Sequence, residues 1–134
     1  SYKTLTNTGT KQKTNTPPNA TAITGAGTLN VNGGTFTNTG GFSQANLTIA
    51  SGATFDNNAS LTASTKLDNK GTLLTTGGNL KSNVTNTGTV GLEGGTLANT
   101  ITGGTVRLDS GTTTITSASY LASSPALTFS GGTC

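Results

Sequence analysis

Residues 67–90 read LDNKGTLLTTGGNLKSNVTNTGTV, and this stretch holds one period of a repeat and the start of the next. Polar sequence rich in Thr, Gly and Asn separates Leu67, Leu73 and Leu80, and Val84 begins the next period. Followed in both directions, the pattern gives three columns in which successive apolar residues lie 16 to 20 residues apart. Column one is Leu29, Leu47, Leu67, Val84 and Ile101; column two is Phe36, Phe55, Leu73, Val90 and Val106; column three is Phe42, Leu61, Leu80, Leu97 and Ile115.

This spacing predicts a chain that winds into three-sided coils, each burying one apolar residue on each side. Segments between the corners, such as Leu47-Thr-Ile49 and Val106-Arg-Leu108, alternate apolar and polar residues as short, half-buried strands do. No window has helical periodicity, and this includes the tail after residue 116. We therefore predict an all-β, three-sided β-solenoid of about five coils.

The composition is consistent with a β-solenoid that has a narrow apolar core and many turns. Among 134 residues there are 32 Thr, 20 Gly and 14 Asn, whereas charged residues make up 8% and aromatic residues 4%. So few large side chains would leave a compact core thin, but a solenoid needs only a narrow apolar row on each side. Thr favours strands, and Gly and Asn favour tight turns.

A phrase of the form apolar-x-Asn-x-Gly recurs and predicts a corner of the coil. We expect its apolar residue to point inward and its Asn to form hydrogen bonds with neighbouring residues at the corner. We expect its Gly to supply the positive φ that the turn needs. A second phrase, Gly-Gly-Thr, predicts another corner followed by a strand. The corner positions of the first phrase are Asn38, Gly40, Asn69, Gly71, Asn86 and Gly88.

The repeat divides the chain into three parts. Residues 27–116 form the predicted solenoid body. Residues 1–26, which contain Pro17-Pro18, are predicted to be an N-terminal arm, a cap or a donated strand. Residues 117–134 lose the pattern and are predicted to be a C-terminal cap or an assembly strand. An alternative is a pilin-like β-sandwich that uses residues 1–26 as its donated strand.

The phrases LDNKGTL at 67–73 and VTNTGTV at 84–90, together with GTLNVNGGTF at 27–36, resemble the repeats of filamentous-haemagglutinin-like proteins. They are also similar to the passenger domains of autotransporter adhesins on bacterial surfaces. The resemblance covers about residues 27–116. It implies a right-handed parallel β-helix, exported by a Gram-negative cell and displayed as a rod. Such rods usually have many more coils, so the resemblance implies a fragment or a subunit that stacks.

Residues that carry chemistry are few. The chain has no His, and its acids are Asp56, Asp68, Glu93 and Asp109, which the sequence does not bring together. We therefore expect no enzyme, no cofactor and no metal site. The net charge of +3 includes Lys3, Lys11 and Lys13 near the N-terminus, a pattern too sparse to predict nucleic-acid binding. No apolar run is long enough to span a membrane.

Other polar residues suggest further hypotheses. Thr-x-Thr pairs could order water on an ice-binding or surface-binding face; they are Thr6/Thr8, Thr37/Thr39, Thr85/Thr87 and Thr112/Thr114. Candidate glycosylation sites are Asn19, Asn46, Asn58 and Asn83. Cys134, the single cysteine, is a chain end or a candidate intermolecular link.

The sequence has no initiator Met and no signal peptide, so we expect a processed or excised chain. We expect it to be an extracellular structural or adhesive subunit on a bacterial surface, with host or surface glycans as candidate partners. Its copies are expected to join through the chain ends into filaments or other homo-oligomers.

Overall fold

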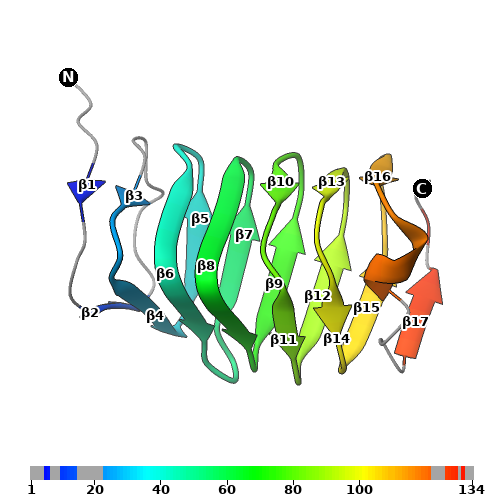
Figure 1. Ribbon diagram of the computed structural model, residues 1–134. Coiled ribbons are helices and arrows are strands. Elements are labelled where there is room, and N and C mark those ends of the chain that lie inside the picture. Colours follow the sequence, from blue (N-terminus) through cyan, green and yellow to red (C-terminus); the bar gives the residue numbers. More distant parts are fainter. Residues whose placement is uncertain (1–4, 7–9, 15–22, 122–125, 130, 132–134) are drawn as a thin grey trace.

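The computed structural model shows a right-handed parallel β-solenoid, as the sequence predicts (Figure 1). It describes residues 5–6, 10–14, 23–121, 126–129 and 131. All strand pairs among these residues are parallel. The β-sandwich alternative is therefore wrong, because a sandwich of that class is built from antiparallel sheets.

The strands form three sides, which we number after the columns they carry. Sides one and three belong to one 11-stranded sheet, because β6 and β8 bend around the corner between them. Side three has β1 (Leu5–Thr6), β3 (Ile23–Thr24), the first halves of β6 (Phe42–Ile49) and β8 (Ser60–Asn69), β10 (Asn79–Leu80), β13 (Gly95–Leu97) and β16 (Thr113–Ile115). Side one has β2 (Thr10–Thr14), β4 (Thr28–Gly33), the second halves of β6 and β8, β11 (Val84–Asn86) and β14 (Ile101–Thr102).

Side two is a separate six-stranded sheet that closes each coil. A short 3-10 helix, η1 (Ala118–Leu121), precedes its last strand, and its four residues are too few to give helical periodicity in the sequence. The strands of side two are β5 (Thr35–Asn38), β7 (Thr54–Asn57), β9 (Thr72–Thr75), β12 (Thr89–Leu92), β15 (Thr105–Leu108) and β17 (Ala126–Phe129).

Each apolar column is a ladder of residues paired in register from coil to coil. In column one, for example, Leu67 pairs with Leu47 on one side and with Val84 on the other. Columns two and three follow the same rule through their length. All column residues except the half-buried Ile115 are at most 3% exposed, so three stacked rows form the core. Phe55 fills its centre, with ring centroids 5.3 Å from Phe36 and 5.8 Å from Phe42.

Buried asparagines form ladders at two of the corners. Asn38 Nδ2 donates to Asn57 Oδ1 at 2.9 Å, and Asn69 Nδ2 donates to Asn86 Oδ1 at 2.9 Å. Each of these four amides also donates to a backbone carbonyl further along the chain. The first ladder ends side two and the second ends side one, so the recurring Asn phrase marks two different corners.

The glycines of the same phrase have a different role from the one we expected. Gly40, Gly71 and Gly88 are not among the described glycines with positive φ, so that expectation is wrong for them. A Cβ on Gly71 would collide with the carbonyls of Ala50 and Ala53, and a Cβ on Gly88 would collide with the Gly71 carbonyl. Glycine is required at positions 71 and 88 because consecutive coils approach too closely there for a side chain. Positive φ occurs instead in the Gly-Gly-Thr corners, for example at Gly34, where φ is 63°.

Both terminal segments contain strands that pair within the chain. In the segment 1–26, β1 pairs with β3, and β2 pairs with β4. Column three therefore continues back through Ile23 to Leu5. In the segment 117–134, β17 pairs with β15 and places Leu127 in register with Val106.

Candidate functional site

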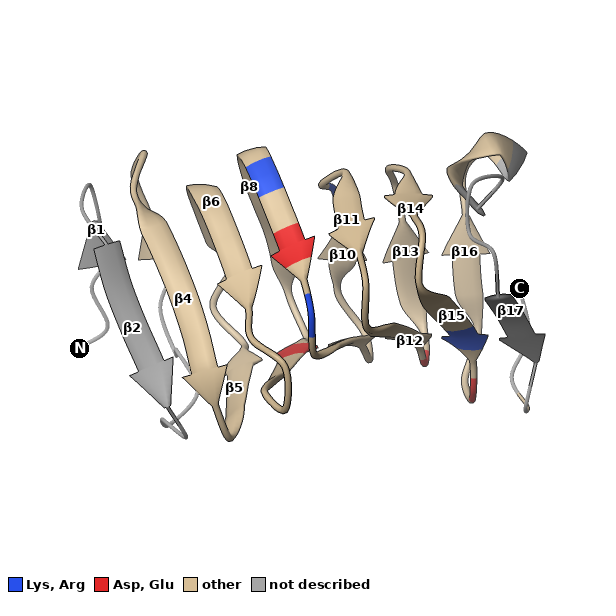
Figure 2. Cartoon of the chain, turned by 90° about the horizontal axis from the view of Figure 1, so that it is seen from below, with Lys and Arg blue, Asp and Glu red and all other residues tan. Residues whose placement is uncertain are grey.

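The four acidic residues lie at three places on the solenoid, on side one, on side two and at the corner after side two (Figure 2). Asp56 lies on β7, in register with Thr37 and Leu74 of side two. Asp68 lies on β8, in register with Thr48 and Thr85 of side one. These two carboxylates therefore belong to different sheets, as their separate columns in the sequence suggest.

Glu93 and Asp109 are brought together at the corner after side two. A Cβ on Gly91 would lie 3.7 Å from Glu93 Oε1 and 3.6 Å from Asp109 Oδ2, so both carboxylates lean over the same backbone. Arg107 engages Asp109, with Nη2 at 3.0 Å from Oδ1 and Nε donating to it at 3.2 Å. Sequence reasoning missed this cluster, although the separation of Glu93 and Asp109 by one repeat would have revealed it.

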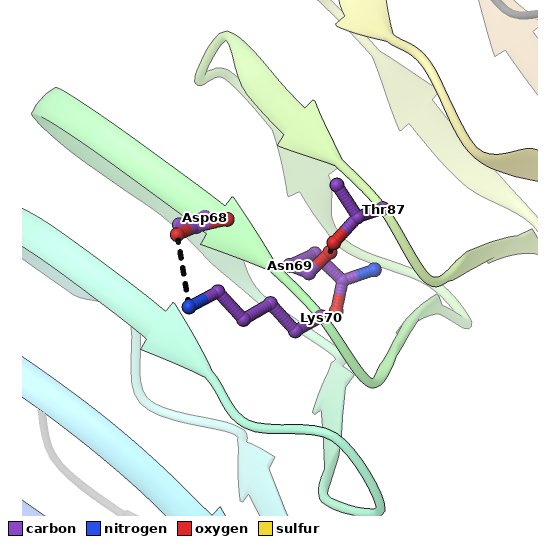
Figure 3. A network of polar contacts seen from close by, with 4 residues as sticks. All are labelled: Asp68, Asn69, Lys70 and Thr87. Carbon is purple, nitrogen blue, oxygen red and sulfur yellow. Dashed lines mark hydrogen bonds and ion pairs between the residues drawn. The ribbon is translucent and has the colours of Figure 1, made fainter.

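Asp68 contributes to a small polar network on side one (Figure 3). Lys70 Nζ lies 4.0 Å from Asp68 Oδ2, and the Lys70 side chain is 58% exposed. Beside them, the Thr87 hydroxyl donates to the Asn69 carbonyl at 3.4 Å and so joins two consecutive coils. An ion pair this exposed contributes about 0–1 kcal/mol to the stability of the fold. The network therefore lies on the surface without adding much to the stability of the coil.

The Thr-x-Thr pairs proposed from the sequence do not stack on one another. Thr37 is on side two, in register with Asp56, whereas Thr85 is on side one, in register with Asp68. Thr114 is on side three. Thr6 is also on side three, and Thr8 lies outside the described residues. These pairs therefore do not form one array on a single side of the solenoid.

A different threonine ladder runs along the outer surface of side two. One Thr from each coil is paired in register with the Thr of the next coil, and neighbouring rungs are about 4.8 Å apart. Sequence reasoning missed the ladder because it searched for Thr-x-Thr pairs. The signal was a Thr directly before every member of column two. The ladder, which we call the side-two threonine ladder, is Thr35, Thr54, Thr72, Thr89 and Thr105.

The candidate glycosylation sites have different surroundings. Asn58 and Asn83 are exposed, and each accepts a hydrogen bond, from the Thr76 hydroxyl and from the Thr100 N–H respectively. Asn46 is half-buried and donates to the Thr28 hydroxyl at 3.3 Å. Asn19 and Cys134, the candidate intermolecular link, lie outside the described residues.

No cavity is found in the described part of the chain. The same residues contain no cluster of three or more His, Cys, Asp or Glu that could hold a metal ion. They also contain no helix long and apolar enough to cross a membrane.

No protein-family model, curated protein or solved structure matches this chain.

Proposed function

We propose that this chain is a structural and adhesive β-solenoid on the outside of a bacterial cell, and that it acts by presenting its outer sides without catalysing a reaction. The observation that carries the proposal is the side-two threonine ladder, a straight row of hydroxyl groups from five consecutive coils. Hydroxyl groups donate and accept hydrogen bonds, which suits contact with the hydroxyl-rich surface of a glycan.

The inner ladders support a mechanical role for the solenoid. Each coil is bonded to the next by a parallel backbone ladder and by stacked apolar residues, and buried Asn amides join two pairs of coils, Asn38 to Asn57 and Asn69 to Asn86. A hydrogen bond of this kind contributes about 1 kcal/mol net, and an unpaired amide costs more. Such a stack holds the outer rows of side chains in fixed positions. A surface that binds its partner through many contacts at once requires this rigidity.

Adhesion to glycans tests the proposal. Beads coated with the protein should adhere to immobilised host or microbial glycans, and the double variant Thr72→Ala with Thr89→Ala should adhere more weakly. Thr96→Ala with Thr114→Ala, on side three, is the matched control and should leave adhesion unchanged. If the wild type adheres to no glycan surface, or if the side-two and control variants weaken adhesion equally, the proposal fails.

Ice binding is a second candidate, which the side-two threonine ladder favours because its repeated hydroxyls could order water. Against it, the neighbouring ladder on the same side contains Asp56, Leu74, Gly91 and Arg107, which do not repeat. Inhibition of ice recrystallisation by the wild type, and its loss in Thr72→Tyr, would favour this candidate over adhesion.

Joining of copies through the chain ends is part of the proposed role. Column three is the row best suited to such a joint, because it runs through apolar residues from Leu5 to Ile115. Ile115 is half-buried at the C-terminal end of that row, whereas its register partner Leu97 is fully buried.

A further inference from the structure

The outer face of side two carries a row of residues that changes from coil to coil. It lies beside the side-two threonine ladder, and the parallel register pairs its members in the same way. Arg107 is exposed, and Asp56 and Leu74 are half-buried, so these side chains are accessible to another molecule. The row, which we call the side-two variable row, is Thr37 on β5, Asp56 on β7, Leu74 on β9, Gly91 on β12 and Arg107 on β15.

The side-two variable row is complementary to itself when its direction is reversed. If β9 of one copy faces β12 of a second copy, β7 faces β15, because the strands are evenly spaced in the sheet. Asp56 then lies opposite Arg107 of the second copy, and two-fold symmetry forms this pair twice. Leu74 lies opposite Gly91, so the one large apolar side chain of the row meets the position that has no side chain.

The centre of such a pair has room for its apolar residues. Within one chain, Leu74 Cδ2 lies 2.7 Å from the place that a Cβ on Gly91 would take, so Leu74 already leans over the Gly91 backbone. The Leu74 side chains of the two copies would therefore meet beside the two-fold axis, each above a glycine. A larger residue at position 91 would occupy this space.

The corner that follows side two matches in the same register. Asn58, Thr76, Glu93 and Asp109 directly follow the paired residues that end β7, β9, β12 and β15. Reversal places Thr76 opposite Glu93, and Asn58 opposite Asp109. Neutral side chains then face both carboxylates, and the Asn58 amide can donate a hydrogen bond to Asp109 of the second copy.

Other arrangements of the same two faces lack this match. If the two solenoids ran in the same direction, Asp56 would face Asp56 and Arg107 would face Arg107, and like charges placed opposite each other repel. A reversed pair shifted by one strand would place both residues opposite uncharged residues. Charge therefore favours one direction and one register.

We propose that side two is a self-association surface, on which a second copy of this chain packs face to face with its solenoid axis reversed. The sheet has six strands of four residues each. It measures about 13 Å by about 25 Å, so each copy contributes about 300–400 Å². An interface of this size is typical of weak, transient pairing.

This pairing is lateral and does not involve the chain ends, so it is compatible with end-to-end joining and does not rest on the proposed function. Paired copies cover the side-two threonine ladder. Pairing and glycan adhesion therefore compete for one face, and the weakness of the pairing leaves single copies available for adhesion.

Sedimentation equilibrium of the full chain at concentrations up to about 1 mM tests the pairing. The wild type should dimerise weakly. Asp56→Arg and Arg107→Asp should each weaken dimerisation about ten-fold or more, because each variant places like charges opposite each other. An equal mixture of the two variants should dimerise again, because position 56 of each copy then faces the opposite charge at position 107 of the other. Retained β-sheet circular dichroism would show that the variants are folded.

Further variants separate the position of the charges from their amount. Asp56→Arg with Arg107→Asp in one chain exchanges the two signs and should dimerise as the wild type does. Asp68→Arg and Lys70→Asp make the same reversals on side one and should leave dimerisation unchanged.

Three results would overturn the pairing. They are the absence of a wild-type dimer over the whole concentration range, equal association of the wild type and the single side-two variants, and a mixture that dimerises no better than its separate components. Glycans are absent from this measurement, so the pairing can fail while the proposed function stands, and the reverse also holds.

Discussion

Two buried threonines should respond in opposite directions to the same substitution. Thr75 lies on β9 and is 0% exposed, and its hydroxyl has no hydrogen-bond partner. Thr113 lies on β16 and is 1% exposed, and its hydroxyl accepts the N–H of Gly94 at 3.1 Å. Valine has the shape and β-branching of threonine, so Thr→Val changes the polar group and little else.

The sizes of the two effects follow from the hydrogen bonds. In Thr75→Val a methyl group replaces a hydroxyl whose burial without a partner costs about 1–3 kcal/mol, so the free energy of unfolding should rise by up to that amount. In Thr113→Val the buried Gly94 N–H loses its acceptor, and the free energy of unfolding should fall by about 1–3 kcal/mol. For a chain of this length, each kcal/mol corresponds to about 4 °C in Tm.

Thermal and urea unfolding, followed by circular dichroism at the β-sheet band, would measure both variants beside the wild type. We expect Thr75→Val to raise Tm and Thr113→Val to lower it, with an unchanged dependence on urea concentration. If both substitutions move Tm in the same direction, the assignment of one satisfied and one unsatisfied hydroxyl is refuted.

Three further predictions concern the core, a corner and catalysis. Leu80→Asp buries a carboxylate with no partner in column three and should unfold at least one coil, whereas Lys81→Asp at the next, exposed position should leave the β-sheet signal intact. Gly88→Ala should lower the free energy of unfolding by about 1–3 kcal/mol because its Cβ would collide with the backbone of the preceding coil. Gly77→Ala is the control, because its Cβ would have no atom within 4 Å, and it should leave the Tm unchanged or raise it. Pectin, alginate and chitin should not be cleaved, and product formation that Asp109→Asn abolishes would contradict the non-catalytic proposal.

The repeat predicted most of the fold because the solenoid core follows from a one-dimensional pattern. A residue such as Leu67 must recur once per coil to be covered on both sides, and this requirement is visible in the spacing. The ends could not be predicted in the same way. The apolar repeat does not extend into β2, which has Lys11 and Lys13 in register with Leu29 and Val31, and η1 has no repeat to reveal it.

The outer surface was predicted less well than the core, for a physical reason. Neighbouring residues in the sequence alternate between inside and outside, whereas neighbours on the surface come from successive coils. Glu93 and Asp109 therefore both lie over the backbone of Gly91 although they are 16 positions apart in the sequence, and Thr37 and Thr85 lie on different sides although their local sequences look alike. The corner glycines were misjudged because close packing between coils leaves no mark on the local turn sequence.

The central claim is that consecutive repeats stack one above another along a single axis. Dipolar electron paramagnetic resonance tests it by measuring the distance between two spin labels in a Cys134→Ser background. One label is at position 35, and the other is at position 72, 89 or 105. These positions share one ladder, so the distances should rise in equal steps of about 4.8 Å per coil, from about 10 Å to about 19 Å. Distances that do not rise with the number of intervening coils would contradict the solenoid and every proposal that depends on it.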